Sequence, residues 1–346
     1  MLLKTLRPVL LLALIVSLFS CSEDEAPSET GGSETPVQAE DIFNYIALRN
    51  DGTLFAIGDK TGKVVQTGKI PGIEFNTLFN SVTSSASETF IYEHRFDPPR
   101  GILYVWDKQS GETTSTIIDF PEEFGENTAL ISLDWDKDNQ NLIGITRENI
   151  EQSNHQKPVK VVRINPENFQ ITSQDIDLNP EGYENIFSTS LVGQKLYVVA
   201  SKTERVINAD LLEINLNQNS IEVLPLTGAE TNILNIGNGG DPNQLFGFST
   251  VANSNFMAEV RPVVYNLQTE TINEVAGVPR ISALNFAHKT FYNKEQGTFA
   301  ALMGANNTTN LIKYTPSTGN FELITIPNPD GLSSLINIIG VEKLKL

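Results

Sequence analysis

The segment Leu103-Tyr-Val-Trp-Asp-Lys-Gln-Ser-Gly-Glu-Thr-Thr114 joins two short β-rich runs through a tight polar turn. Val, Tyr and Trp favour strands, whereas Asp, Ser and Gly favour hairpin turns because they bond to nearby backbone or tolerate left-handed conformations. Five further copies of this pattern recur along the chain, at Leu54–Val65, Val161–Ile171, Leu211–Ile221, Val263–Ile272 and Leu311–Phe321. The sequence therefore predicts six related β-hairpins.

The spacing of these hairpins predicts the architecture. Their turns begin 49, 58, 50, 51 and 49 residues apart, at Gly58, Asp107, Asn165, Asn215, Asn266 and Thr315. A repeat of about 40 to 50 residues is typical of propellers and solenoids. Splitting the long interval between Asp107 and Asn165 would give seven units instead of six.

A second series of short apolar runs precedes the hairpins, for example Leu130–Leu133 and Ile186–Thr189. The third position of every run is small: Ser81, Ser132, Ser188, Asn235, Ala283 and Asn337. Small side chains suit an innermost strand, because six blades converge on one axis there. We therefore expect these runs to line the centre of a ring.

The two ends of the repeat series complement each other. The last run, Leu335–Ile338, has no hairpin after it, and the first hairpin unit, residues 44–70, has no inner run before it. The sequence thus predicts an all-β, six-bladed β-propeller in which the C-terminal strand pairs into the first blade and leaves no open sheet edge at the closure. In repeat number and closure, residues 42–346 resemble the TolB-like and lactonase-like propellers; the sequence has no WD series and no Ser-x-Asp-x-Gly-x-x-Trp box.

The first residues indicate export. Lys4 and Arg7 precede an apolar run, Val9–Phe19, which has the length of a signal-peptide core and is shorter than the roughly 20 residues of a spanning helix. Leu18-Phe-Ser-Cys21 resembles the lipobox of bacterial lipoproteins, which implies that residues 1–20 are a signal peptide and that Cys21 carries the lipid. An ordinary signal peptide with an incidental cysteine is the alternative.

Residues 21–41 are predicted to form an acidic, disordered stalk, because Ser, Thr, Gly and Pro with seven acidic residues cannot bury a core. The cluster Glu23-Asp-Glu25 resembles the surface-export signal of Bacteroidota lipoproteins, although a merely solvated acidic tether would explain the same residues. We expect a lipid-anchored protein of the outer membrane, exposed at the cell surface, with residues 42–346 as its propeller.

Charge excludes one class of partner. The chain carries 24 Lys and Arg against 42 Asp and Glu, a net charge of −18, and 22 basic against 35 acidic residues remain from Ile42 onward. Nucleic-acid binding depends on clustered positive charge. We therefore expect no nucleic-acid partner.

Few residues point to catalysis. The three histidines, His94, His155 and His288, are far apart and lack zinc-ligand spacing, and the chain has no Gly-x-Ser-x-Gly elbow or phosphate-binding glycine loop. We expect no metal and no cofactor. His94 ends a predicted second strand and could face a pocket, or it could be an ordinary hydrogen-bonded blade histidine.

Asp134-Trp-Asp-Lys-Asp-Asn139 has the alternating oxygen ligands of a calcium loop. The late acidic ligand that such a loop needs falls on Ile145, however. A polar hairpin between the first and second strands of the third blade accounts for the same residues.

One cationic pattern stands out against the acidic background. Four neighbouring blades carry a cation at the equivalent end of the second strand, whereas blades five and six have Thr250 and Gly304 there: the cations are Arg49, Arg95, Arg147 and Lys202. In the propellers that the chain resembles, these ends lead to the ligand-binding face. The four residues, which we call the basic arc, are candidates to bind a carboxylate or sulfate, or each pairs with a nearby acid such as Glu93, Asp97 or Glu148.

Two functions remain open. A binding or scaffold propeller would engage an anionic glycan, a peptide or a partner outer-membrane protein. A lactonase, hydrolase or lyase would have its site in the central funnel. Fold does not decide between them, and the lack of a catalytic constellation in the sequence favours binding.

Overall fold

The computed structural model describes residues 40–74, 81–148, 158–202, 209–228, 232–239, 241–252, 258–278, 281–285, 289–305, 308–327 and 336–344. The predicted signal peptide, Cys21 and nearly all of the predicted stalk lie outside this part, as do His155 and His288. Within it, no helix is long and apolar enough to cross a membrane.

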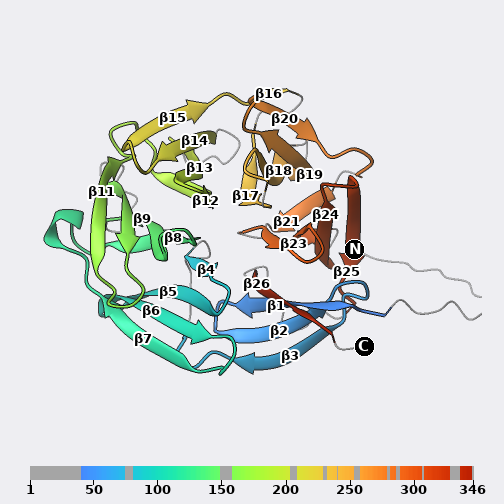
Figure 1. Cartoon of the computed structure of the whole chain (residues 1–346), viewed down its shortest axis with the longest axis horizontal. Coiled ribbons are helices and arrows are strands. Elements are labelled where there is room, and N and C mark those ends of the chain that lie inside the picture. The colour runs from blue at the N-terminus through green and yellow to red at the C-terminus, as the bar shows by residue number, and fades with distance from the viewer. Residues whose placement is uncertain are drawn as a thin grey trace, which may run out of the picture. The chain divides into compact units, whose positions relative to one another are not determined.

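Six blades form a ring, each with its strands ordered from the axis outward (Figure 1). Blade 1 contains β26 (Ile336–Lys343), β1 (Phe43–Arg49), β2 (Thr53–Gly58) and β3 (Val64–Lys69). Blade 2 contains β4 (Val82–Ser84), β5 (Glu88–Phe96), β6 (Pro99–Asp107) and β7 (Thr113–Ile118). Blade 3 contains β8 (Ala129–Asp136), β9 (Asn141–Arg147), β10 (Val159–Ile164) and β11 (Ile171–Asp177).

Blades 4 to 6 complete the ring. Blade 4 contains β12 (Asn185–Val192), β13 (Lys195–Ser201), β14 (Asp210–Asn215) and β15 (Ser220–Leu224). Blade 5 contains β17 (Leu234–Asn238), β18 (Gln244–Ala252), β19 (Ala258–Asn266) and β20 (Thr271–Glu274), with β16 (Thr227–Gly228) parallel to β20 at its outer edge. Blade 6 contains β21 (Ile281–Asn285), β22 (Phe291–Asn293), β23 (Thr298–Ala305), β24 (Thr308–Thr315) and β25 (Asn320–Thr325).

The predicted closure is confirmed. β26 pairs antiparallel with β1 from Phe43 opposite Lys343 to Arg49 opposite Ile336, so the C-terminal strand is the innermost strand of blade 1. Six blades are confirmed as well, and the seven-unit reading is wrong. The long interval after Asp107 is filled by a connection with a short 3-10 helix, Glu122–Phe124, and by a long link between β9 and β10.

The six hairpin turns share one backbone conformation. The fourth residue after each predicted turn start has a positive φ, between 51° and 73°, and these residues are Gly62, Gly111, Phe169, Asn219, Glu270 and Gly319. In blades 2 to 5 the first side chain accepts backbone N–H bonds from the turn, as Asp107 does from Gln109 at 2.9 Å and from Ser110 at 2.6 Å. Local side-chain chemistry therefore sets the repeat that the sequence displays.

The apolar core lies between the blades. Phe90, Tyr92 and Leu103 of blade 2 pack with Leu130 and Leu142 of blade 3, and similar clusters join the other neighbouring blades. Each blade is thus held by both of its neighbours. Loss of one strand at the closure would expose apolar surface on two blades.

The inner strand of blade 6 differs from the prediction. Residues 281–285 form β21, but this strand also pairs with β19 of blade 5 and so joins the two blades into one sheet. The innermost position continues as β22, which pairs with β23 between Phe291 and Asn293. The short apolar run at Ile281 predicted a strand, but a contact with another blade decides its partner.

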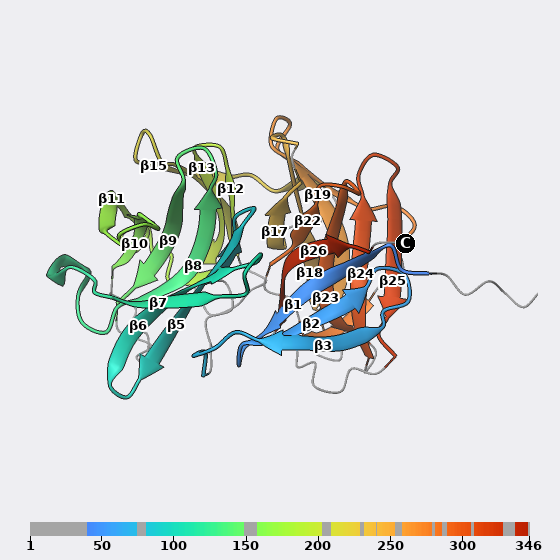
Figure 2. The ribbon, with the colours of Figure 1, turned by 60° about the horizontal axis from the view of Figure 1, so that its bottom comes forward.

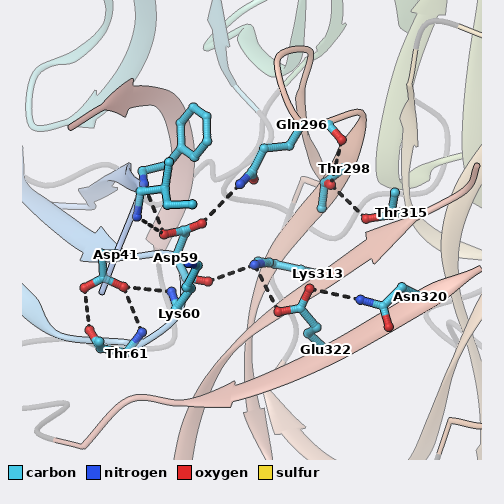
Figure 3. A network of polar contacts seen from close by, with 12 residues as sticks. Asp41, Asp59, Lys60, Thr61, Gln296, Thr298, Lys313, Thr315, Asn320 and Glu322 are labelled. Atoms are coloured by element: carbon cyan, nitrogen blue, oxygen red, sulfur yellow. Dashed lines mark hydrogen bonds and ion pairs between the residues drawn. The ribbon is translucent and has the colours of Figure 1, made fainter. Parts of the chain in front are cut away.

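Polar contacts reinforce the seam between blades 1 and 6 (Figure 3). Asp59 accepts bonds from the backbone N–H groups of Ile42 and Phe43, at 2.8 and 3.0 Å, and from Gln296 of blade 6 at 3.1 Å. The carboxylate of Asp41, the last residue of the predicted stalk, accepts hydrogen bonds from the backbone N–H and the hydroxyl of Thr61. The start of β1 is therefore fixed to both blades.

Candidate ligand-binding face

The four residues of the basic arc lie at the ends of the second strands of blades 1 to 4. Arg49 ends β1, Arg95 is the penultimate residue of β5, Arg147 ends β9 and Lys202 directly follows β13. Second strands run in the same direction in every blade, so these residues lead into loops of one face. Their local partners differ from blade to blade.

Arg49 is paired with a carboxylate. Its Nε and Nη2 donate to the two oxygens of Asp51 at 2.9 and 2.7 Å, and Nη2 also donates to Thr53. The hydrogen bonds from Arg49 hold the pKa of Asp51 well below its usual value. Since this bidentate pair already occupies the Nε and Nη2 donors, Arg49 is engaged within its own blade.

Arg95 lies in a denser network between blades 1 and 2. It forms ion pairs with Glu74 at 3.0 Å and Glu93 at 3.4 Å, and it donates to Gly72 O and to the hydroxyl of Tyr104. Burial and the neighbouring Glu93 raise the pKa of Tyr104 to about 12, so its hydroxyl remains protonated and donates to Gly72. This cation anchors a loop of the preceding connection.

The blade 3 and blade 4 members have different surroundings. Arg147 is half-buried, and burial lowers its pKa while the charge of Glu184 opposes the shift. Lys202 is exposed, and its Nζ lies 4.7 Å from the centre of the Tyr183 ring. Nearby in blade 3, Lys160 lies 5.0 Å from the ring of Phe124 and donates to Glu123 O. Aromatic rings and carbonyl groups attract these lysines without neutralising their charge.

Blade 5 buries the equivalent position. Thr250 is 2% exposed and, with its N–H, donates to the side chain of Asn232, which in turn donates to Thr250 O. This position is therefore part of the blade interior. The arc is confined to blades 1 to 4.

His94 lies apart from the arc. Consecutive strand residues point to opposite sides, so His94 faces blade 3 together with Tyr92 and Phe96, whereas Arg95 faces blade 1. His94 is 3% exposed; its Nδ1 is 3.4 Å from the Tyr92 hydroxyl and its ring packs edge-on against Phe96. Burial lowers its pKa, and its Nε2 has no hydrogen-bond partner among the described residues.

His94 and Phe96 lie on the β5–β6 hairpin, near its tip. Figure 2 shows this tip projecting at one side of the ring. Phe96 near the tip is 42% exposed. Gly101 opposite His94 is required by packing, because a Cβ there would lie 2.4 Å from the Tyr92 hydroxyl. The hairpin is therefore built around the Tyr92 side chain.

Residues 134–139, which were considered as a calcium loop, belong to the β8–β9 hairpin. Asp136 accepts bonds from the N–H groups of Asp138 and Asn139, both at 3.1 Å, as the first residue of a turn does. Asp134 instead lies on the inner strand β8 and pairs with Lys289. In the part of the chain that the structure describes, no group of three or more His, Cys, Asp or Glu could hold a metal ion.

Several hydrogen-bond and ion-pair partners of the candidate residues could not be predicted from the sequence. Glu74 and Tyr104 reach Arg95 from other strands and loops, and Lys289 reaches Asp134 from a distant blade. Asp51 and Glu93 had a local signal, since each lies two residues from the arginine with which it pairs. Pairing of the arc with acids, the alternative reading, holds for Arg49 and Arg95.

Comparisons with known proteins identify the fold. No family model and no curated protein matches the sequence. Among solved structures, TolB from Acinetobacter baumannii is 9% identical with a TM-score of 0.53; the match covers 82% of this chain and 63% of that one. A putative TolB from Agrobacterium tumefaciens is 8% identical with a TM-score of 0.50, covering 82% of this chain and 89% of that one. The chain has a TolB-like six-bladed propeller fold, and likeness at this identity shows the fold alone.

Proposed function

We propose that this protein is a binding propeller that engages an anionic ligand or partner through the face that carries the basic arc. The observation that supports this proposal is the exposed Lys202, which an aromatic ring holds in place at one end of an arc in an otherwise acidic molecule. A cation positioned in this way retains its charge for a ligand.

Lys202, the blade 4 member of the arc, is the better candidate for contact with the ligand. Arg49 and Arg95 use their donors on Asp51, Glu74 and Glu93, so a ligand would have to displace these carboxylates. Lys202 is exposed beside Tyr183. An acidic glycan, an acidic peptide or a carboxylate-rich surface of a partner protein has matching chemistry.

We further propose that the propeller is anchored by lipid at Cys21 and displayed at the cell surface. The predicted lipobox and the acidic cluster after it support this proposal. Cys21→Ser should abolish lipid labelling and release the protein from the membrane; a variant that stays membrane-bound would overturn the anchor. Replacing Glu23, Asp24 and Glu25 with Ala should leave a lipidated protein that external protease cannot reach, and unchanged accessibility would overturn the export signal.

Binding is tested by melting scans of a soluble form that begins at Ser22. The probes are sulfated and uronic-acid polysaccharides, dicarboxylates and acidic peptides at low salt. A ligand of the folded state raises Tm by mass action, and the shift should shrink as salt rises, because exposed charges are screened over about 10 Å at 0.1 M.

Arg147→Gln with Lys202→Gln should remove most of that shift. The matched control is Lys195→Gln, at the opposite end of the same strand β13, where Lys195 pairs with Glu213 at 2.6 Å. The control should respond to the probes like the wild type. If no probe shifts the wild-type transition, or if the shift survives in the double variant, the basic arc is not the binding site.

A further inference from the structure

An ion pair joins two strands that are far apart in the chain. The Nζ of Lys289 lies 3.1 Å from Oδ1 of Asp134 and also donates to the backbone carbonyl oxygen of Leu133. Asp134 and Leu133 belong to β8, the inner strand of blade 3, whereas Lys289 lies between β21 and β22 of blade 6. The pair therefore connects the inner edges of two blades.

These two blades lie on opposite sides of the ring. Blades 4 and 5 separate them in one direction, and blades 1 and 2 separate them in the other (Figure 1). A direct contact between their inner edges has to cross the central axis. The side chains of Lys289 and Asp134 remain 16% and 12% exposed, so solvent reaches the pair.

The acceptors form a site for an ammonium group. One carboxylate oxygen of Asp134 and the Leu133 carbonyl face Nζ, and the second carboxylate oxygen accepts a bond from the Thr189 hydroxyl of blade 4. Thr189 thereby fixes the carboxylate in its orientation. An ammonium offers three donors and no acceptor, which suits these oxygens.

Lys289 comes from the place where blade 6 is least regular. β21 also pairs with blade 5, and β22 contributes only three residues to the inner position. The neighbouring Thr290 donates a 2.6 Å bond to Asn235 O on the inner strand of blade 5. Thr290 and Lys289 together fix this segment to blade 5 and to blade 3.

We infer that the propeller axis carries an ammonium-binding site, made by Leu133 O, Asp134 and Thr189, which the protein fills with its own Lys289. The site takes a primary ammonium group and is separate from the basic arc, which attracts anions. It fastens the irregular inner segment of blade 6 to the opposite side of the ring.

Removal of the lysine should leave a site that small amines fill. Lys289→Ala should lower Tm by roughly 5 °C, because it leaves a largely buried carboxylate without its counter-charge. Ethylammonium chloride should restore much of that loss in a saturable way, whereas tetraethylammonium chloride at equal ionic strength should not. Lys289→Met keeps the side-chain stem up to the position of Cε, so this variant should lose stability without being rescued.

The carboxylate should be essential to the rescue. Ethylammonium should not rescue Asp134→Asn with Lys289→Ala, because the amide lacks the charge that holds the amine. Failure to rescue Lys289→Ala, or equal stabilisation of all variants, would overturn the site.

A second measurement does not depend on a variant that lacks the lysine. Reductive methylation followed by mass spectrometry should modify Lys289 of the wild type at least tenfold more slowly than the exposed Lys195, and Asp134→Asn should remove most of that protection. Equal rates at the two lysines in the wild type would also overturn the inference.

Discussion

The ammonium group of Lys313 in blade 6 donates a 2.8 Å hydrogen bond to the backbone carbonyl oxygen of Asp59 in blade 1. Lys313 is 5% exposed and also pairs with Glu322 at 3.1 Å, within its own blade (Figure 3). Since the carboxylate of Asp59 binds the backbone of Ile42 and Phe43 at the start of β1, a single lysine supports the blade in which the first and last strands of the ring pair.

Lys313→Met should therefore destabilise the fold. The substitution leaves the Asp59 carbonyl without its donor, and such a loss costs about 1–3 kcal/mol. Lys195→Met is the control, because the pair of Lys195 with Glu213 is at the surface and contributes at most about 1 kcal/mol. Urea unfolding measures both, and equal losses would show that the seam contact is no more important than a surface pair.

The hairpin repeat could be predicted because its cause is local. An Asp or Asn at the start of a turn accepts bonds from the N–H groups two and three residues later, so the residue type at this position specifies the turn geometry. The closure could be predicted too, since an unpaired last strand needs a partner. The link between β21 and β19 could not, because it depends on which strand edge of another blade is available.

Glu270→Gly should stabilise the protein. Glu270 has a φ of 55° in a turn where Gly62, Gly111 and Gly319 occupy the equivalent position. A non-glycine residue pays roughly 1 kcal/mol in this conformation, and the added chain entropy of glycine offsets part of the gain. We expect a net gain of about 0.5 kcal/mol in the free energy of unfolding.

Gly111→Ala makes the opposite change to Glu270→Gly at the equivalent position of another turn. Its φ is 73° and a Cβ would meet no atom within 4 Å, so only the backbone conformation changes in energy. It should lose about 0.5 kcal/mol, because the lower chain entropy of the unfolded alanine variant offsets part of the strain. If both substitutions shift Tm in the same direction, backbone strain does not govern these turns.

His94 should make stability depend on pH. Burial lowers its pKa below the usual 6.5, so at pH values below that the unfolded chain binds a proton that the folded protein resists. Stability should therefore be fully present above pH 6.5 and decline as the pH falls below it. His94→Phe removes this titration, and the difference in Tm between wild type and variant should change between pH 8 and pH 5.5. A constant difference would contradict the buried neutral state.

The positions of the candidate site residues could be predicted from the sequence, but the charge that each of them presents could not. The equivalent positions of Arg49, Arg95, Arg147 and Lys202 follow from the repeat, but the charge that each presents depends on partners from other segments. Glu74 neutralises Arg95 from the preceding connection, whereas Tyr183 holds Lys202 without removing its charge. The contact of Lys289 with Asp134, 155 residues away, has no sequence signal at all.

Removal of residues 334–346 should open the ring. Blade 1 would lose β26, so β1 would lose the backbone pairing that now runs from Phe43 to Arg49. Ile338 and Ile339 would leave the clusters that they share with blades 6 and 2, exposing apolar surface beside an unpaired strand edge. We expect aggregation or a Tm lower by more than 10 °C, since several buried aliphatic side chains are lost together.

A synthetic peptide of residues 336–346 separates closure from a general effect of truncation. If β26 acts by pairing with β1, the peptide should bind the truncated protein and raise its Tm, whereas a peptide with proline in place of Ile338 should not, because proline removes a backbone donor and interrupts the strand. An unchanged Tm after truncation would show that the last strand is dispensable for the ring. Equal rescue by both peptides would show that it acts through apolar contact and not through strand pairing.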